Sequence, residues 1–139
     1  MDHRKRHGAV QDMATYGACT GSPDPNNFIS HGLNIRAGKD GHSTLYVVGH
    51  GGREAIEVFD MDASGAKPAL TWTGCVMTPE GMAANSVASL SDGSLLATIP
   101  LQTGKDISEA ISGGLTGGLW AVGSIGVVVD FFAPFFQAA

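Results

Sequence analysis

Two histidines stand at the outer ends of a predicted β-hairpin. The dipeptide Asp40-Gly41 is a strong turn signal, and apolar, β-branched residues flank it on both sides. If the turn is centred there, His31 lies directly opposite His50, with Cβ atoms about 5 Å apart. A slip of the register by one residue would turn one ring to the other face of the sheet.

Neighbouring imidazoles at His31 and His50 have three interpretations. They form a proton-handling pair, in which one ring acts as general base on water and the other sets its tautomer. They bind a transition metal, because imidazole suits zinc and copper. Or they are exposed loop histidines with satisfied hydrogen bonds and no chemical role, and the residues alone leave this choice open.

A third polar residue, Asn85, occupies a comparable place further along the chain. Asn85 precedes a predicted strand and the turn dipeptide Asp92-Gly93, much as His31 precedes a strand and Asp40-Gly41. In a β-propeller, where the first strand of each blade lines the central channel, both residues would face the same opening. The amide oxygen of Asn85 suits calcium, although an isolated asparagine can equally be a cap or turn residue.

The elements that would position these residues are short strands separated by turn residues. Glycine is frequent (20 of 139 residues), as many tight turns require, and the only helix candidate is the short segment Lys105–Ile111. The expected strands are Leu33–Arg36, Thr44–Val48, Ile56–Asp60, Leu70–Val76, Ser86–Leu90, Ser94–Ile99 and Gly118–Val122. A unit of this kind that restarts after about 50 residues fits the blades of a propeller. The same spacing fits a plain antiparallel sandwich equally well.

We therefore expect an all-β fold, a partial β-propeller of about two four-stranded antiparallel blades. We divide the chain into a loose N-terminal segment (1–18), the partial propeller (19–122) and an atypical apolar tail (123–139). The tail carries Val127-Val128-Val129 and two Phe-Phe pairs where a polar turn and a channel strand should follow. A truncation or a reading-frame shift near Ala121 would explain this composition.

Composition excludes several classes of function. A net charge of −5 argues against nucleic acid as a partner, because phosphate binding needs a basic surface. The apolar stretch 115–136 is interrupted by Asp130 and Pro134, so we expect no membrane span. We see no signal peptide and leave the localisation unknown, and a periplasmic or secreted parent protein is compatible with the sequence.

Two other sets of reactive residues receive structural interpretations. Cys19 and Cys75 either form a disulfide or stay free, and two cysteines are too few to build a disulfide framework. Glu57, Asp60 and Asp62 follow one predicted strand, and we interpret them as a solvated acidic edge.

Three short runs in the same order resemble segments of one known family, the calcium-dependent paraoxonase/arylesterase enzymes. Around Gly49–Asp62 the chain is similar to bacterial members of the gluconolactonase-like superfamily, and the resemblance covers roughly Tyr16 to Val122. The three runs, which resemble the family's Pro-His-Gly, Val-Asn-His and Asn-Asp-Ile segments, are Phe28–Ile35, Leu45–His50 and Pro79–Val87.

The resemblance implies a six-bladed propeller that holds calcium in its channel and hydrolyses lactones and aryl esters. His31 and His50 match the histidine dyad that activates water, and Asn85 matches one ligand of the calcium that polarises the carbonyl. The remaining blades, with the remaining ligands, are not in this chain. We therefore expect a fragment of a small-molecule ester or lactone hydrolase that is inactive alone.

Two alternatives stay open beside the hydrolase. The chain could belong to a non-catalytic propeller that serves as a binding scaffold, because one fold hosts many functions. It could also be a fragment without function, whose unpaired strand edges would promote aggregation.

Overall fold

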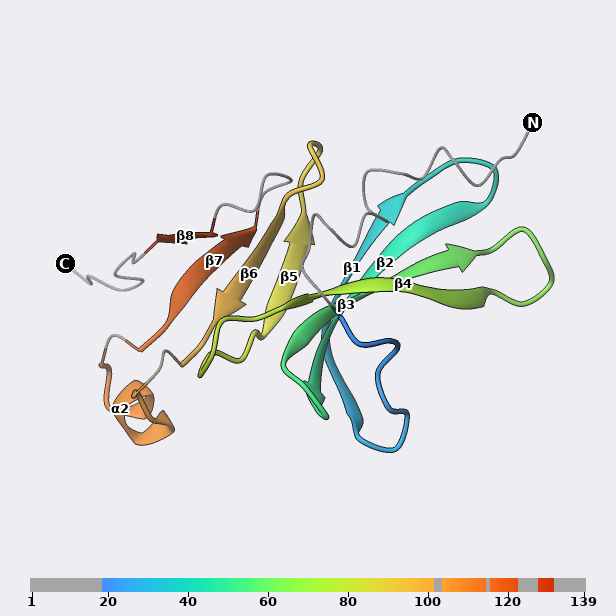
Figure 1. Cartoon of the computed structure of the whole chain (residues 1–139). Helices are drawn as coiled ribbons and strands as arrows, with labels where there is room; N and C mark the ends of the chain where they lie inside the picture. Colours follow the sequence, from blue (N-terminus) through green and yellow to red (C-terminus); the bar gives the residue numbers. More distant parts are fainter. Residues whose placement is uncertain (1–18, 102–103, 115, 123–127, 132–139) are drawn as a thin grey trace.

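The structure is a computed structural model, which describes residues 19–101, 104–114, 116–122 and 128–131. These residues form eight strands and one short helix (Figure 1). The first four strands are β1 (Phe28–Ala37), β2 (His42–Gly51), β3 (Ala55–Asp62) and β4 (Ala69–Met77). The others are β5 (Ser86–Ser89), β6 (Leu95–Ile99), β7 (Gly118–Val122) and β8 (Val128–Phe131), and the helix is α2 (Ile107–Ile111).

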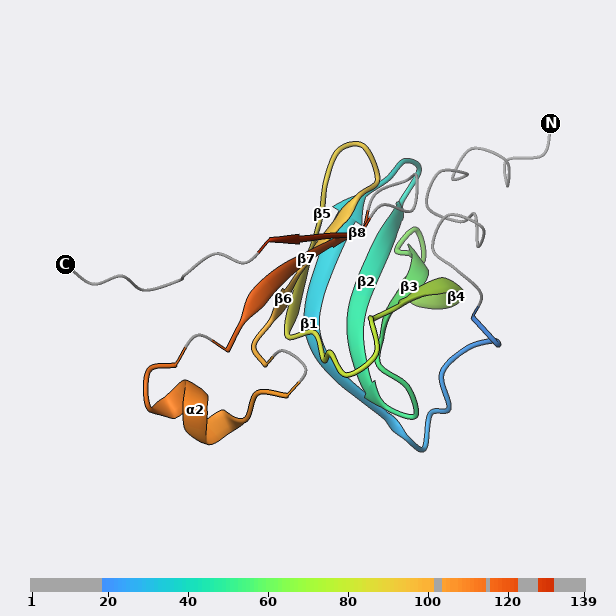
Figure 2. The same ribbon diagram turned by 60° about the vertical axis from the view of Figure 1, so that its left-hand side comes forward.

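The strands make two open antiparallel sheets, each built in chain order. One sheet has the order β1-β2-β3-β4 and the other β5-β6-β7-β8. The helix α2 connects β6 to β7 and projects from the second sheet (Figure 2). The expectation of an all-β chain with little helix is confirmed. The helix is shorter than the predicted Lys105–Ile111 because Asp106 caps it, accepting a hydrogen bond from the amide of Glu109.

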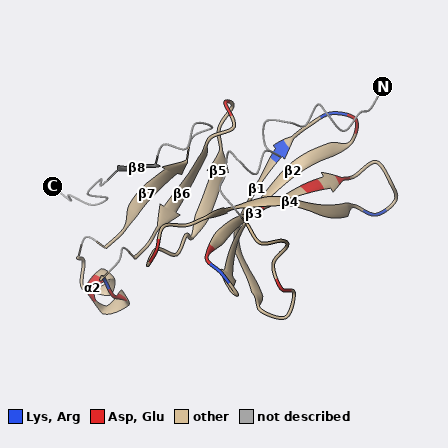
Figure 3. Ribbon diagram, in the orientation of Figure 1, with Lys and Arg blue, Asp and Glu red and all other residues tan. Residues whose placement is uncertain are grey.

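The core lies between the two sheets. Alternation along β2 and β3 directs one set of apolar side chains toward the second sheet, which contributes its own set in return. Figure 3 shows that the strands are largely uncharged and that charges concentrate at strand ends and loops. The core residues are Tyr46, Val48, Ile56, Val58, Val76, Ala84, Val87, Leu95, Ala97, Ile99, Trp120 and Val122.

The first strands of the two sheets contact each other. The side-chain oxygen of Asn34 on β1 accepts hydrogen bonds from the amide (3.1 Å) and hydroxyl (2.8 Å) of Ser89 on β5. Further along, the Arg36 guanidinium donates to the carbonyl of Ser91 at 2.8 Å. Glycine at position 32 lets the backbones approach closely, because a Cβ there would overlap the carbonyl oxygen of Asn85.

The register of the β1–β2 hairpin differs from the one centred on Asp40-Gly41, which is wrong. His50 lies opposite Ile29, not opposite His31, and Leu33 lies opposite Val47. A bulge between Ser30 and Leu33 causes part of this difference. Since β-bulges re-aim side chains, it is this irregularity that decides where His31 points.

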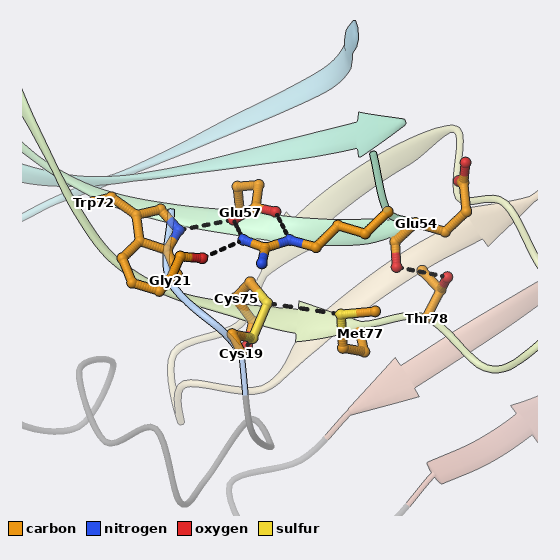
Figure 4. A network of polar contacts seen from close by, with 9 residues as sticks. Cys19, Gly21, Glu54, Glu57, Trp72, Cys75, Met77 and Thr78 are labelled. Carbon is orange, nitrogen blue, oxygen red and sulfur yellow. Dashed lines mark hydrogen bonds and ion pairs between the residues drawn. A yellow bond between two sulfur atoms is a disulfide. The ribbon is translucent and has the colours of Figure 1, made fainter. Parts of the chain in front are cut away.

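The prediction that Glu57 lies on a solvated acidic edge is wrong. Its side chain is 0% exposed and accepts two hydrogen bonds from Arg53, at 2.7 and 2.8 Å. The indole nitrogen of Trp72 donates a third at 2.7 Å (Figure 4). Burial is possible because three donors satisfy the carboxylate. Asp60 and Asp62, in contrast, remain partly exposed.

A disulfide between Cys19 and Cys75, one of the two possibilities that the sequence left open, ties the start of the described chain to β4. Arg53 strengthens this attachment by donating a hydrogen bond of 2.8 Å to the carbonyl of Gly21. The segment at Cys19 and Gly21 is therefore held beside Glu57 on the outer face of the first sheet, the face turned away from the second sheet (Figure 4).

Part of the apolar C-terminal segment belongs to a sheet. Val128–Phe131 forms β8 and pairs with β7, where Val122 lies opposite Val128. Its β-branched composition suits a strand. The rest of the segment, residues 123–127 and 132–139, lies outside the described residues, as does the expected loose segment 1–18.

Within the described ranges, no helix has the length and apolar character needed to cross a membrane.

We expect Glu57→Ala to lower the free energy of unfolding by about 3 kcal/mol, because it leaves Arg53 and Trp72 without their acceptor in a buried site. Urea unfolding followed by far-UV circular dichroism measures the change. Lys67→Ala is the control, since the side chain is exposed and surface changes stay within about 0.5 kcal/mol. A loss for Glu57→Ala as small as that of the control would contradict the structural role.

Candidate active site

The two predicted histidines meet at the end of the β1–β2 hairpin. His31 Nδ1 and His50 Nε2 lie 3.3 Å apart, within hydrogen-bonding distance. The ring centroids are 5.4 Å apart and the planes are inclined by 61°. The bulge explains the contact: Ser30 pairs with Gly49 and Leu33 with Val47, so two residues of β1, His31 among them, share the space opposite Val48.

A carboxylate completes a chain of three side chains. Glu54 Oε2 lies 2.6 Å from His50 Nδ1, on the opposite side of the ring from His31. Glu54 immediately precedes β3, on the turn that follows β2. His50 is the least exposed of the three: His31 is exposed, the Glu54 side chain is 43% exposed and the His50 side chain is 21% exposed.

The loop that carries Glu54 is held from two sides. The backbone carbonyl of Glu54 accepts hydrogen bonds from both the backbone amide and the side-chain hydroxyl of Thr78, each at 3.1 Å (Figure 4). The same hydroxyl lies 2.8 Å from the carbonyl of Met82, beyond the end of β4. On the other side, Arg53 is fixed by the buried Glu57. The position of Glu54 therefore follows from the sheet rather than from the turn alone.

Asn85 lies near the histidines at the level of the backbone. Asn85 is exposed, and its backbone N–H donates to the backbone carbonyl of Thr98 at 2.8 Å. Its carbonyl oxygen occupies the space that a side chain at Gly32, the neighbour of His31, would need. The structure thus brings His31 and His50 into contact and places Asn85 at the start of the adjacent first strand.

The described residues do not supply a complete calcium site. Calcium takes six to eight oxygen ligands, and Asn85 offers one amide oxygen. In this part of the chain no group of three or more His, Cys, Asp or Glu side chains is placed to hold a metal ion. A calcium ion next to Asn85 would therefore need further oxygen ligands besides this amide.

A cavity of about 380 Å³ borders His50. This is within the range of small-ligand pockets. One wall is the segment that the disulfide holds, and the rest comes from the ends of the first sheet. The lining residues are Cys19, Thr20, Ser22, Pro23, Asp24, Phe28, His50, Gly52, Arg53 and Met77.

A second histidine–carboxylate pair lies at the opposite end of β2. His42 Nδ1 is 2.9 Å from Asp60 Oδ2, and Asp62 lies 3.9 Å from the other ring nitrogen. The hydrogen bond to Asp60, helped by the negative charges nearby, raises the pKa of His42 above its usual value. This pair has the same kind of contact as His50 and Glu54 but does not line the cavity beside His50, which makes it a useful internal control.

Glu54 is a site residue that the sequence motifs do not predict. The signal was its spacing of four residues after His50 across the Gly51-Gly52 pair, since a tight turn brings such positions together. That spacing also fits an exposed loop acid, so only the structure separates the two readings.

Comparison with known proteins does not assign a family: no family model, no curated protein and no solved structure matches this chain. The resemblance to paraoxonase-like enzymes stays a prediction based on the motifs around His31, His50 and Asn85.

The disulfide should support both the stability of the chain and the cavity wall. We expect Cys19→Ser/Cys75→Ser to lower the free energy of unfolding by about 2–4 kcal/mol, because the bond closes a long loop in the unfolded chain. Amide hydrogen exchange in the segment 19–24 should also accelerate. Dithiothreitol should reproduce both effects in the wild type and leave the double variant unchanged; identical stability of the oxidised and reduced wild type would contradict this.

Proposed function

We propose that these two sheets belong to a β-propeller hydrolase of the paraoxonase/gluconolactonase-like class, acting on small esters or lactones. The observation that carries the proposal is the contact of His31 with His50 beside the cavity. Paired imidazoles can accept a proton from water near neutral pH, and the adjoining space can hold the rest of a small substrate.

The chain order of the sheets supports the propeller over the sandwich. Sandwiches commonly exchange strands between their two sheets through Greek-key connections. Here each sheet consists of four consecutive strands, and the first strands β1 and β5 lie side by side. Successive blades around an axis have this arrangement.

The proposed reaction needs one proton acceptor and one proton donor. One imidazole of the pair takes a proton from water while the water oxygen forms a bond to the ester carbonyl carbon, and the carbonyl π electrons move onto its oxygen. When the tetrahedral species collapses, the bond to the leaving alkoxide breaks and the imidazolium returns the proton to it. The products are a carboxylic acid and an alcohol, or a hydroxy acid from a lactone.

We also propose calcium as the cofactor, on the resemblance and the amide oxygen of Asn85. A bound divalent cation supplies positive charge that polarises the carbonyl and stabilises the oxyanion. Asn85 would be one ligand, and the others would come from residues beyond those described.

We expect His31→Ala and His50→Ala each to lower kcat/KM for phenyl acetate and δ-valerolactone at least about 100-fold, the range typical of a lost general acid–base group. Because the chain alone is expected to be inactive, the rate is measured by a spectrophotometric or pH-stat assay of the complete propeller that contains these two sheets. His42→Ala is the matched control, because His42 lies at the other end of β2. Hydrolysis by the wild type that survives both active-site substitutions would refute the role of the pair.

The calcium requirement can be tested separately. EGTA should abolish hydrolysis of phenyl acetate and added calcium should restore it, whereas Asn85→Ala should raise the calcium concentration needed for half-maximal activity. Hydrolysis that is insensitive to EGTA would contradict the metal and leave the histidine mechanism in place.

One observation favours a non-catalytic binding scaffold as the second candidate. Leu33 and Ile35 on β1 are 63% and 54% exposed, so the outer face of the first sheet presents apolar side chains. A complete propeller containing these sheets that unfolds cooperatively, hydrolyses neither substrate and shows no change in melting temperature with calcium would favour this candidate.

A further inference from the structure

We propose that Glu54 is a positioning residue that holds His50 in a single tautomer and thereby sets the direction of the hydrogen bond between the two histidines. The inference deepens the proposed hydrolase function and rests on it. It assigns a third member to the site, one to which neither the motifs nor the resemblance gives a role.

The first step is the chemistry of the His50–Glu54 contact. The two heavy atoms lie 2.6 Å apart, a distance typical of a strong, charge-assisted hydrogen bond. An ionised carboxylate can only accept, so the proton of this bond must be on Nδ1 of His50. In neutral His50, the other ring nitrogen, Nε2, is then an acceptor.

The tautomer of His50 also decides which ring donates in the hydrogen bond between the two histidines. Nε2 of His50 lies 3.3 Å from Nδ1 of His31. Because Nε2 of neutral His50 accepts, Nδ1 of His31 must be the donor in that contact. Neutral His31 then keeps its lone pair on Nε2, which makes this atom the one in the pair that can take a proton from water.

The backbone that carries the Glu54 carboxylate is held rigidly. Glu54 is held through its carbonyl by Thr78, and its neighbour Arg53 is held by the buried carboxylate of Glu57. Its own side chain is nevertheless 43% exposed. A partly exposed polar contact of this kind contributes little to stability, so the effect of this contact should be on the orientation of the His50 ring rather than on folding.

The test uses the tautomers themselves. Long-range ¹H–¹⁵N correlation spectra at alkaline pH report which ring nitrogen of each histidine carries the proton. Wild-type His50 should be in the Nδ1–H form. Glu54→Gln should give a mixture of both forms, because an amide can donate as well as accept, and Glu54→Asp should keep more of the Nδ1–H form than Glu54→Gln.

The kinetic effect should follow the tautomer. We expect Glu54→Gln to lower kcat for phenyl acetate about 10-fold, at the lower end of the range for residues that orient a primary ligand or base, with little change in KM. The melting temperature should stay close to that of the wild type. Asp60→Asn, which alters the corresponding pair at His42, should change neither the His50 spectrum nor kcat.

The outcomes separate this inference from the proposed function. A wild-type His50 in the Nε2–H form, or a Glu54→Gln spectrum identical to that of the wild type, would overturn the role of Glu54 even if the chain hydrolyses esters. A shift of tautomer in a complete propeller that contains these sheets but hydrolyses neither ester nor lactone would support Glu54 as the positioning residue and remove the hydrolase.

Discussion

The buried carboxylate of Glu57 is the constraint on which the rest of the first sheet depends. A charge at a fully buried position requires donors on several sides, and here they come from Arg53 and Trp72. Arg53 also reaches the segment that begins at Cys19. One ionic group thus links the β2–β3 turn, β4 and the disulfide-held segment.

This constraint extends to the candidate site because Arg53 and Glu54 are adjacent. Once the guanidinium is fixed, the next residue has little freedom, and Thr78 removes most of what remains. The carboxylate of Glu54 can then order His50, which in turn contacts His31. A buried structural interaction and a half-exposed chemical one therefore share a single turn of the chain.

The sequence predicts the strands well, because turn residues and alternating apolar residues are local signals. It predicts the meeting of His31 and His50 through a register that is off by one position near the turn and by two at His50, and the contact survives because of a bulge that no local pattern indicates. Glu57 was misplaced for a different reason. Alternation shows which face of a strand a residue is on, but what covers that face depends on a disulfide with a distant cysteine.

The close approach at Gly32 has a consequence for the distance between the sheets. Because glycine has no side chain, the backbones of β1 and β5 can touch at this point. A single methyl group at position 32 would have to displace the backbone at Asn85, and β5 with it. His31 directly precedes Gly32 on one side of this contact, and Asn85 directly precedes β5 on the other side. The separation between the imidazole pair and the amide is therefore set by steric contact between backbones, and it would widen with any side chain at position 32, however conservative in polarity.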